Sequence, residues 1–540
     1  MVLGSDSCLA RIKKTGFRTG FMNNQKIDWP SFIASITIIL IASITLVLFP
    51  ENGARHLTNL YAFISGHFAF VYLLAGVATL SLLIWLAASK YGKIRLSADD
   101  EQPEFGSLSW AAMLFCAGIG AGLMYWAPIE WAYYIDAPPF GAEAGSVAAA
   151  QWASSYGIFH WGPTAWAFYC LPTIAIAYPY YVKKLPHLRL STSCYYFLKG
   201  KEDSAAARLI DWLFMIGLLG GAGTSLGFST PMIAAAVSRI TGLEANFSLE
   251  FGVVAVSVVL FGASVWMGLK KGIKRLSDIN IWLAFVLLGY ILVVGPTIFL
   301  LNTSMNSIGL IAQNFIRMNT WTDVFSNSGF VKDWTIFYWA WWIAYGPFVG
   351  LFVTRISSGR TIRQIIFGML VYGSLGGALF YMILGNFGLH LQTTETLAVS
   401  SILANEGGPA AIVAILDQLP FATLIIGVFA LIALIFSATT YDSASYILAS
   451  SATRKLEAKE DPVRWHRLFW AVALAVLPLT LMFIGGLKTI QSATLIVSLP
   501  LIIVGVLMAV SLVRQLQADH EPSTGETASN KPSSKDYTEG

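Results

Sequence analysis

Long apolar stretches alternate with short polar segments from residue 30 to residue 513. Each apolar stretch holds about 20 residues or more, the length that an α-helix needs to cross the hydrocarbon core of a bilayer. The pattern predicts an all-α membrane protein with twelve transmembrane helices. The predicted spans cover residues 30–50, 61–88, 107–135, 152–182, 206–239, 247–269, 277–301, 334–354, 364–388, 420–450, 466–486 and 490–513.

The basic residues predict which side of the membrane each connecting segment faces. With the N-terminus in the cytoplasm, all but five of the 34 Lys and Arg residues fall in segments that the span pattern places on the cytoplasmic side. Lys and Arg are enriched in this way in cytoplasmic loops, and one missed span would scramble the bias downstream. We therefore expect both termini to be cytoplasmic. The five exceptions are Arg55, Arg239, Arg317, Lys332 and Lys488.

Composition excludes a soluble protein. Charged residues make up only 12% of the chain, whereas soluble domains carry about a quarter. The net charge of +4 comes from the cytoplasmic loops, so no nucleic-acid partner is expected. We expect three parts: a basic cytoplasmic segment (1–29) without the apolar core of a signal peptide, a membrane domain (30–513), and a polar, disordered cytoplasmic tail (514–540).

Two of the longer connections have patterns of their own. Residues 302–333 alternate apolar and polar side chains in a way that predicts a helix lying partly along the membrane surface. Residues 389–419 contain turn-forming Thr, Gly and Pro residues and predict a loop with short helices. The seven histidines show no metal-ligand spacing and the four cysteines are scattered, so neither a resident cofactor nor a disulfide framework is expected.

One stretch concentrates the aromatic residues of the chain. Between residues 334 and 345, Trp334, Tyr338, Trp342 and Tyr345 follow one another at steps of four, four and three, which places them along one stripe of a helix. Ring faces attract a cation that cannot donate a hydrogen bond, such as a quaternary ammonium group. A bulky core face or a belt of interfacial aromatic anchors would produce the same spacing, so spacing alone leaves these alternatives open.

The surrounding motifs resemble those of the betaine/choline/carnitine transporter (BCCT) family. Residues 333–335 read DWT, 337–342 read FYWAWW and 355–363 read RISSGRTIR, in the order and spacing of that family. The resemblance implies secondary transport of a small trimethylammonium substrate across the lipid bilayer of the bacterial cytoplasmic (inner) membrane. It also implies two inverted five-helix repeats, spans 3–7 and 8–12, as in sodium-coupled amino-acid carriers, with spans 1 and 2 peripheral. Assembly as a homotrimer is implied by the family only.

The resemblance further implies a substrate site built from aromatic rings. Span 4 carries Trp161, Trp166 and Tyr169, which share one broad face if the helix is continuous, and Pro163 is expected to kink it. With Trp342 of span 8, these residues match the family's aromatic box (Trp161, Trp166, Tyr169 and Trp342). Further positions are predicted at the substrate or along its route. Glu130 and Tyr133, at the outer end of span 3, are candidates to shape entry or to orient the tail of the substrate. On span 8, Trp339, Trp341 and Tyr345 either line the route inward or simply pack.

Residues 116–122 read Cys-Ala-Gly-Ile-Gly-Ala-Gly in the middle of span 3. Alternate glycines weaken a helix by roughly 1 kcal/mol each, so local unwinding is expected, although small residues also serve helix packing. Unwinding frees carbonyl and N–H groups that a cavity or ligand must satisfy. We expect Gly118, Gly120 and Gly122 to border the substrate.

The family builds a sodium site from this break and a later span. Matching the motifs implies carbonyl ligands at Cys116, Ile119 and Phe436 and hydroxyl ligands at Thr439 and Thr440. The alternative is that Ser and Thr hydroxyls merely bond to their own helix. Na+ is then the coupling ion, and sodium-independent relatives carry an Arg that aligns with Asn280 here. That difference favours sodium symport.

Gly122 bears on the substrate. Choline-importing relatives tend to carry an acidic residue at this position, so a zwitterion such as glycine betaine or carnitine, compounds used as osmoprotectants, is the better match. Rival functions are a sodium-independent carnitine/betaine exchanger, a choline importer, a membrane-embedded enzyme, and an osmosensor or scaffold. An enzyme is disfavoured because Glu130, His160 and Asp442 are isolated in the sequence and form no nucleophile–base motif; a scaffold would not need an aromatic box.

Overall fold

The computed structural model describes residues 27–97, 102–185, 187–199, 201, 203–267, 273–456 and 460–520. Within these ranges the chain is almost entirely helical, and β-pairing is limited to two isolated bridges, Ile27–Thr453 and Arg95–Thr361. The predicted N-terminal segment lies almost wholly outside the described residues, as does the chain beyond His520. The all-α prediction is confirmed for the described part.

The α-helices differ widely in length. They are α2 (Trp29–Leu48), α3 (Pro50–His67), α4 (Ala69–Ala88), α5 (Ser107–Asp136), α6 (Val147–His160), α7 (Pro163–Ala177), α8 (Tyr195–Leu198), α9 (Ala205–Thr241), α10 (Phe247–Met267), α11 (Ile273–Val294), α12 (Thr297–Thr320), α13 (Phe337–Ile356), α14 (Ile362–Gly368), α15 (Ser374–Phe380), α16 (Asn386–Thr393), α17 (Val399–Glu406), α18 (Gly408–Asp417), α19 (Ala422–Ser451) and α20 (Arg464–His520). Short 3₁₀ or π-helical segments are η2 (Lys90–Lys93), η3 (Pro139–Gly141), η4 (Tyr178–Val182), η5 (Leu190–Cys194), η6 (Val331–Ile336), η7 (Met369–Gly373) and η8 (Tyr381–Gly385).

Not every predicted span is a single long helix. In the described part, seven helices are long and apolar enough to cross a bilayer, and an eighth is obtained if the bent pair α11 and α12 is counted as one span. Twelve crossings therefore remain a prediction. Several predicted spans are interrupted or bent where glycine, proline or aromatic residues stand, and this divides one apolar run between two shorter helices.

Three of these interruptions change the predicted boundaries. The span expected at 61–88 is divided at Phe68, between α3 and α4. The span at 152–182 is broken at Trp161 and Gly162, because the proline that follows has no N–H for the helix ladder. The span at 277–301 ends at Val294, and α12 leaves at 111°. In this last case the apolar run continues past Gly295 and Pro296 although the helix does not.

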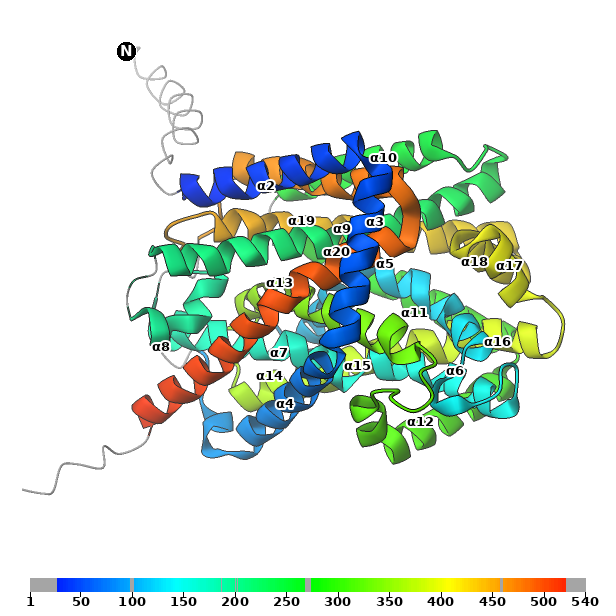
Figure 1. The fold of residues 1–540 in the computed structure, drawn as a ribbon, viewed down its shortest axis with the longest axis horizontal. Helices are drawn as coiled ribbons and strands as arrows, with labels where there is room; N and C mark the ends of the chain where they lie inside the picture. Colours follow the sequence, from blue (N-terminus) through cyan, green and yellow to red (C-terminus); the bar gives the residue numbers. More distant parts are fainter. Residues whose placement is uncertain are drawn as a thin grey trace, which may run out of the picture.

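Helix α20 contains both of the last two predicted spans. At a rise of about 1.5 Å per residue, its 57 residues are far longer than the roughly 30 Å hydrocarbon core. Figure 1 shows the orange-to-red chain changing direction along this element rather than running straight. Its C-terminal end continues as helix to His520, past residue 513, where the last span was expected to end.

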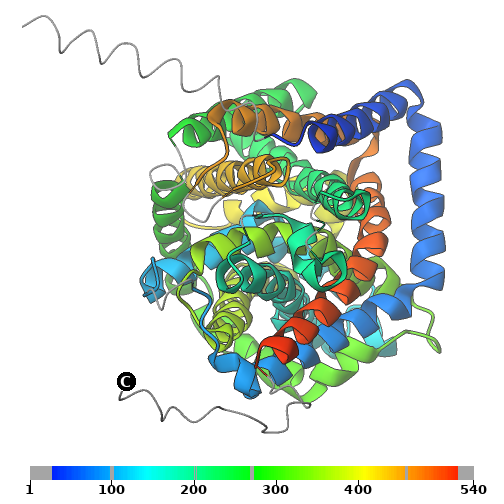
Figure 2. The ribbon, with the colours of Figure 1, turned by 90° about the vertical axis from the view of Figure 1, so that its left-hand side faces the viewer.

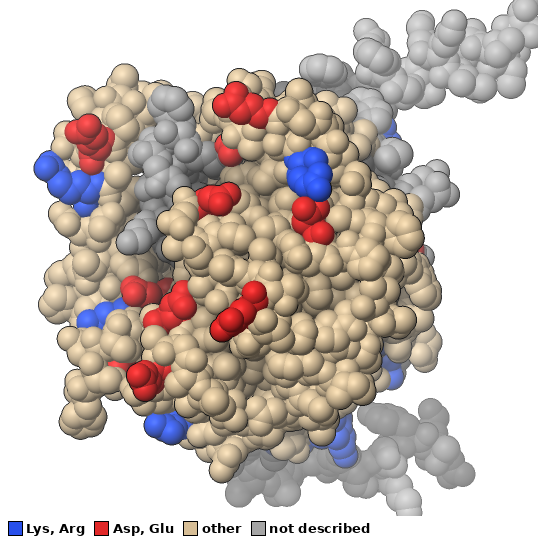
Figure 3. Space-filling view, turned by 90° about the vertical axis from the view of Figure 1, so that its right-hand side faces the viewer, with Lys and Arg blue, Asp and Glu red and all other residues tan. Residues whose placement is uncertain are grey.

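Ion pairs join segments that the basic-residue pattern assigned to one side of the membrane. In Figure 1 the start of α2 and the end of α20 both lie at the left, and ion pairs connect this end with the loops after α7 and α19. At the opposite end Arg239 pairs with Asp417 at 2.8 Å. Figure 3 shows that opposite face, where acidic side chains are more prominent than basic ones. The pairs at the left are Lys183–Asp519, Arg189–Asp203, Arg208–Asp28, Arg454–Asp28 and Arg355–Asp461.

The helices surround α13, which runs through the middle of the molecule. Helices α5, α7, α9, α19 and α20 all contact it. By contrast, α3 runs along the edge of the bundle, as Figure 2 shows for the blue helix at the right. Helix α12 covers most of the segment predicted to lie along the membrane surface, and α17 and α18 are the short helices expected within 389–419. The aromatic stretch thus lies at the centre of the fold.

Candidate functional site

Helix α13 and the short segment η6 before it carry the aromatic stretch. Every residue of α13 is buried except Arg355 at its end. A helix that is apolar and aromatic on all sides is stable only when other elements enclose it, which explains its central position. Tyr338, Trp342 and Tyr345 of the predicted stripe are therefore surrounded by protein, whereas Trp334, in η6, is half-buried.

Helix α5 is interrupted where the alternate glycines predicted unwinding. Gly120 has φ 47° and ψ −152°, a backbone conformation that essentially only glycine adopts. Gly122 lies against the rings of the site: a Cβ built on it would be 2.9 Å from Trp341 and 3.5 Å from Trp161. Gly118 belongs to the turn before the break. The break therefore adjoins the aromatic residues.

Of the other three predicted box residues, Trp161 and Tyr169 lie against the ring of Trp342. The ring centroids of Trp161 and Trp342 are 4.7 Å apart with an interplanar angle of 72°. Tyr169 meets Trp342 at 5.8 Å and 85°. Tyr338 stacks on the same ring at 5.6 Å and 24°. Edges and faces of four rings thus meet deep inside the fold, and all four residues are at most 3% exposed.

Trp166 occupies a different position from the one that a continuous helix would give. Its ring meets Tyr169 at 5.5 Å, and a Cβ built on Gly373 would be only 2.0 Å from it. Among the described ring pairs it has none with Trp161 or Trp342. The predicted common face assumed an unbroken span 4, and the break at Gly162 changes the angle between Trp161 and the later rings. Trp166 reaches the group through Tyr169.

The other predicted pathway residues point to different surroundings. Trp341 belongs to the ring group, stacked on Trp342 at 4.9 Å and 12°. Tyr345 lies one turn further along, 6.4 Å from Tyr169. Trp339 faces away, toward Phe159, Phe168 and Gly76 of α4. Tyr133 contacts Trp126 and Trp334, near the start of η6. Of these four residues, Trp341 contacts the box most directly.

The break also meets the hydroxyl cluster of α19. A Cβ built on Gly120 would lie 2.7 Å from Oγ1 of Thr440, and that buried hydroxyl has no hydrogen-bond partner within the described part of the chain. Thr439 donates its hydroxyl proton to the carbonyl oxygens of Ile435 at 3.0 Å and Phe436 at 3.1 Å. The bond to its own helix satisfies the donor but leaves lone pairs on the oxygen. The hydroxyl oxygen of Thr440 therefore faces the break.

Three other positions relate to the predicted sodium site. Cys116 and Ile119, whose carbonyl groups were predicted to complete it, lie in the helical turn before Gly120; their side chains are outside the described part. Asn280 of α11 is fully buried, and neither atom of its side-chain amide has a hydrogen-bond partner among the described residues. A buried amide without partners is costly, so packing alone does not account for this residue.

A buried carboxylate borders the rings at the N-terminal end of α13. Glu130 accepts hydrogen bonds from the hydroxyl groups of Tyr338 at 2.6 Å, Tyr134 and Tyr381. Nδ1 of His160 is 3.6 Å from it. Only Glu130 among these was named from the sequence as a residue near the substrate. Tyr381 is 251 residues away in the chain, and no local pattern could have connected the two.

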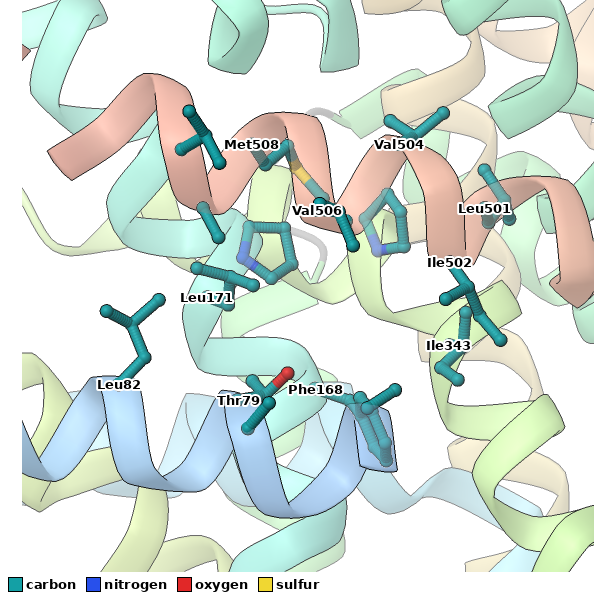
Figure 4. Close-up of a pocket in the computed structure, with 17 residues that line it drawn as sticks. Thr79, Leu82, Phe168, Leu171, Ile343, Leu501, Ile502, Val504, Val506 and Met508 are labelled. Atoms are coloured by element: carbon teal, nitrogen blue, oxygen red, sulfur yellow. The ribbon is translucent and has the colours of Figure 1, made fainter. Parts of the chain in front are cut away.

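A cavity of about 250 Å³ lies between α4, α7, α13 and α20. Figure 4 shows its lining, which is carbon apart from the Thr79 hydroxyl, one thioether sulfur and the ring nitrogens of prolines. Phe168 and Ile343, which line it, stand on the helices that carry the box. An apolar lining offers nothing to a charged solute. This cavity is therefore suited to hydrocarbon, not to a zwitterion.

The chain is similar to known transporters along most of its length. The family model described as "BCCT, betaine/carnitine/choline family transporter" matches residues 30–521. The uncharacterized transporter YeaV of Escherichia coli (strain K12) is 35% identical over 82% of this chain and 92% of its own. A carnitine transporter of Acinetobacter baumannii is 33% identical, covering 92% and 90%.

Two further similarities are to a relative of slightly lower sequence identity and to a solved structure. A probable glycine betaine transporter of Desulfitobacterium hafniense (strain Y51) is 32% identical over 90% of this chain and 98% of its own. Among solved structures, that of a Na+-coupled sialic acid symporter in a substrate-bound outward-open state covers 84% of this chain and 81% of its own. Its TM-score of 0.41 and identity of 14% are too low to indicate a function for this chain.

Proposed function

The chain belongs to the betaine/carnitine/choline family of membrane transporters, and from this premise we propose that it imports a zwitterionic quaternary ammonium compound, such as glycine betaine or carnitine, together with Na+. The observation that carries the proposal is the group of rings around Trp342, next to the glycine break of α5. Transport then proceeds by alternating access between two inverted repeats in the bacterial inner membrane, with both termini cytoplasmic.

The rings supply what a trimethylammonium group needs. Such a group has no proton to donate, so hydrogen-bond acceptors gain little from it, whereas aromatic faces attract its charge. A desolvated cation–π contact contributes about 2 kcal/mol. Trp161, Tyr169 and Trp342 together support a site for one methylated cation, with Trp166 adding to it through Tyr169.

The glycine break supports a zwitterion over a plain cation. Gly122 has no side chain, so the chain offers no acid of its own there, and a Cβ built at this position would lie only 2.9 Å from Trp341. A substrate with its own carboxylate can instead use the N–H groups that an interrupted helix exposes, where the helix dipole favours negative charge. This difference favours betaines and carnitine over choline.

The unpaired hydroxyl of Thr440 supports sodium coupling. It lies against the break, where carbonyl oxygens of α5 and the Thr439 oxygen complete a set of hard ligands of the kind that Na+ prefers. One positive charge moving inward across 100 mV releases about 2.3 kcal/mol. That energy suffices to accumulate a neutral zwitterion roughly fiftyfold before any sodium gradient is counted.

The test is uptake of labelled glycine betaine, carnitine and choline into proteoliposomes, with and without an inward sodium gradient. We expect sodium-stimulated uptake of a betaine or carnitine that exceeds uptake of choline. Uptake that ignores sodium but rises when the vesicles are preloaded with substrate would replace symport by exchange. Failure to transport any methylated onium compound would refute the proposal.

A further inference from the structure

We propose that Glu130 is a positioning residue for the aromatic box: one oxygen of its carboxylate holds the hydroxyl groups of Tyr338 and Tyr381, the two tyrosines whose rings border Trp161. This inference rests on the proposed function, because it concerns the same ring site. It assigns to Glu130 an effect on substrate affinity that it exerts through the tyrosines and not by touching the substrate.

The two oxygens of Glu130 have different partners. Oε2 accepts the hydroxyl of Tyr338 at 2.6 Å and that of Tyr381. Oε1 accepts the hydroxyl of Tyr134, which also lies 3.0 Å from Nδ1 of His160. The Nε2 atom of that histidine is in turn 3.1 Å from Oγ1 of Thr335. The carboxylate is fully buried and has donors on both sides.

The two sides of the carboxylate also differ in what lies beyond the tyrosines. Tyr338 is 6.0 Å from Trp161 and stacks on Trp342 at 5.6 Å. Tyr381 is 6.2 Å from Trp161. The ring of Tyr134 instead meets Tyr156, His160, Phe330 and Trp334, none of which belongs to the box. Only on the Oε2 side do the tyrosine rings themselves contact Trp161 or Trp342. On the Oε1 side His160 stands between Tyr134 and the box, with its ring stacked on Tyr338 at 4.8 Å.

A carboxylate is the side chain that this arrangement requires. Two hydroxyl groups donate to one oxygen and a third donates to the other, and an ionised carboxylate accepts at both oxygens. A glutamine would present an amide that donates on one side, so one group of tyrosines would lose its acceptor. Hydrogen bonds to a charged acceptor are about twice as strong as neutral ones, which keeps the tyrosine rings in one orientation.

The same bonds connect distant parts of the chain. Glu130 stands on the broken helix α5, Tyr338 on α13 and Tyr381 on η8, so the contacts span 208 and 251 residues. The stacked ring of Tyr338 covers one face of Trp342. If the Tyr338 ring turned freely, the Trp342 ring that it stacks on could shift. A methylated cation bound at the box would then lose part of its contact with Trp342. Glu130 therefore fixes the position of the Tyr338 ring.

A purely structural carboxylate is the competing explanation, and concentration dependence separates the two. The experiment compares wild type with Glu130→Gln, Tyr338→Phe and their double variant in proteoliposomes, measuring glycine betaine and carnitine uptake against substrate concentration. Tyr134→Phe serves as the matched control, since it removes a hydroxyl from the other oxygen. Uptake is normalised to the amount of reconstituted folded protein.

We expect Glu130→Gln and Tyr338→Phe each to raise the half-saturating substrate concentration about tenfold, the effect of losing one hydrogen bond to a charged group. The double variant should be no worse than either single variant, because both changes interrupt the same connection. Tyr134→Phe should shift the half-saturating concentration clearly less. Additive effects in the double variant, or an equal shift in Tyr134→Phe, would overturn the proposal.

Two further variants keep the test decisive. If Glu130→Gln does not fold, Tyr338→Phe and Tyr381→Phe decide alone, because each retains its ring: raised half-saturation supports the proposal and wild-type values refute it. Trp342→Leu separates this inference from the proposed function. Loss of uptake in Trp342→Leu with wild-type behaviour of Glu130→Gln rejects only the role of Glu130, whereas a wild type that transports no onium compound rejects the proposed function.

Discussion

The indole N–H of Trp342 donates a hydrogen bond of 2.9 Å to the backbone carbonyl oxygen of His160. That carbonyl stands at the end of α6, where the last carbonyl groups have no partner in their own helix. The bond places the Trp342 ring 4.7 Å from Trp161, the next residue in the chain. The helix break in span 4 and the central tryptophan of α13 thus fix each other's positions.

Replacing Trp342 by Leu is expected to abolish onium uptake, because it removes both the ring and the bond to His160. Trp342→Phe keeps a ring but loses the N–H, and we expect weakened but measurable uptake. The measurement is labelled glycine betaine transport in proteoliposomes. Trp465→Leu, a change of an exposed tryptophan on α20, is the control. Full uptake by Trp342→Leu would disprove the box.

Thr440→Ala should raise the half-saturating sodium concentration by at least about tenfold, since even residues behind a metal ligand change metal affinity by 10- to 100-fold. The reason is the loss of the only hydroxyl at the break that has no partner of its own among the described residues. Sodium-dependent uptake at saturating substrate measures it. Ser450→Ala is the control, because that hydroxyl bonds to Tyr446 of its own helix. Equal sodium dependence in the two variants would move the ion site elsewhere.

Gly120→Ala should eliminate transport while the protein still inserts into the membrane. Alanine is strained at φ 47°, and its methyl group would stand 2.7 Å from the Thr440 hydroxyl. This contact is relieved if the break closes into a regular helix or if the threonine is displaced. Either change removes oxygen ligands from the predicted sodium site. Gly289→Ala on α11, where a Cβ meets nothing within 4 Å, should transport normally. Normal transport by both variants would contradict the role of the break.

Gly373→Ala tests whether Trp166 matters to the site. The new methyl group would lie 2.0 Å from the Trp166 ring, so the ring must move, and Tyr169 beside it must follow. We expect a higher half-saturating concentration for glycine betaine, and partial recovery in the double variant with Trp166→Phe, whose smaller ring leaves room. If the double variant is no better than Gly373→Ala alone, the collision does not act through Trp166.

Much of the architecture follows from local patterns. The apolar runs predict the helices because each must bury its backbone polar groups within its own segment in a bilayer. The alternate glycines predict the break that the structure has at Gly120. The boundaries that differ, at Phe68, Gly162 and Gly295, lie within apolar runs, because hydropathy continues through residues that end a helix.

The sequence by itself therefore determined an all-helical membrane protein and the positions of the motifs that predict a site for a methylated cation. Only the tertiary structure decided which side chains meet. It leaves Trp166 in contact with Tyr169 instead of Trp161 or Trp342, turns Trp339 away, and brings Tyr338 and Tyr381 to Glu130. The physical reason is that hydropathy and periodicity are properties of neighbouring residues. Contacts between rings depend instead on helix breaks and on packing between segments more than 150 residues apart.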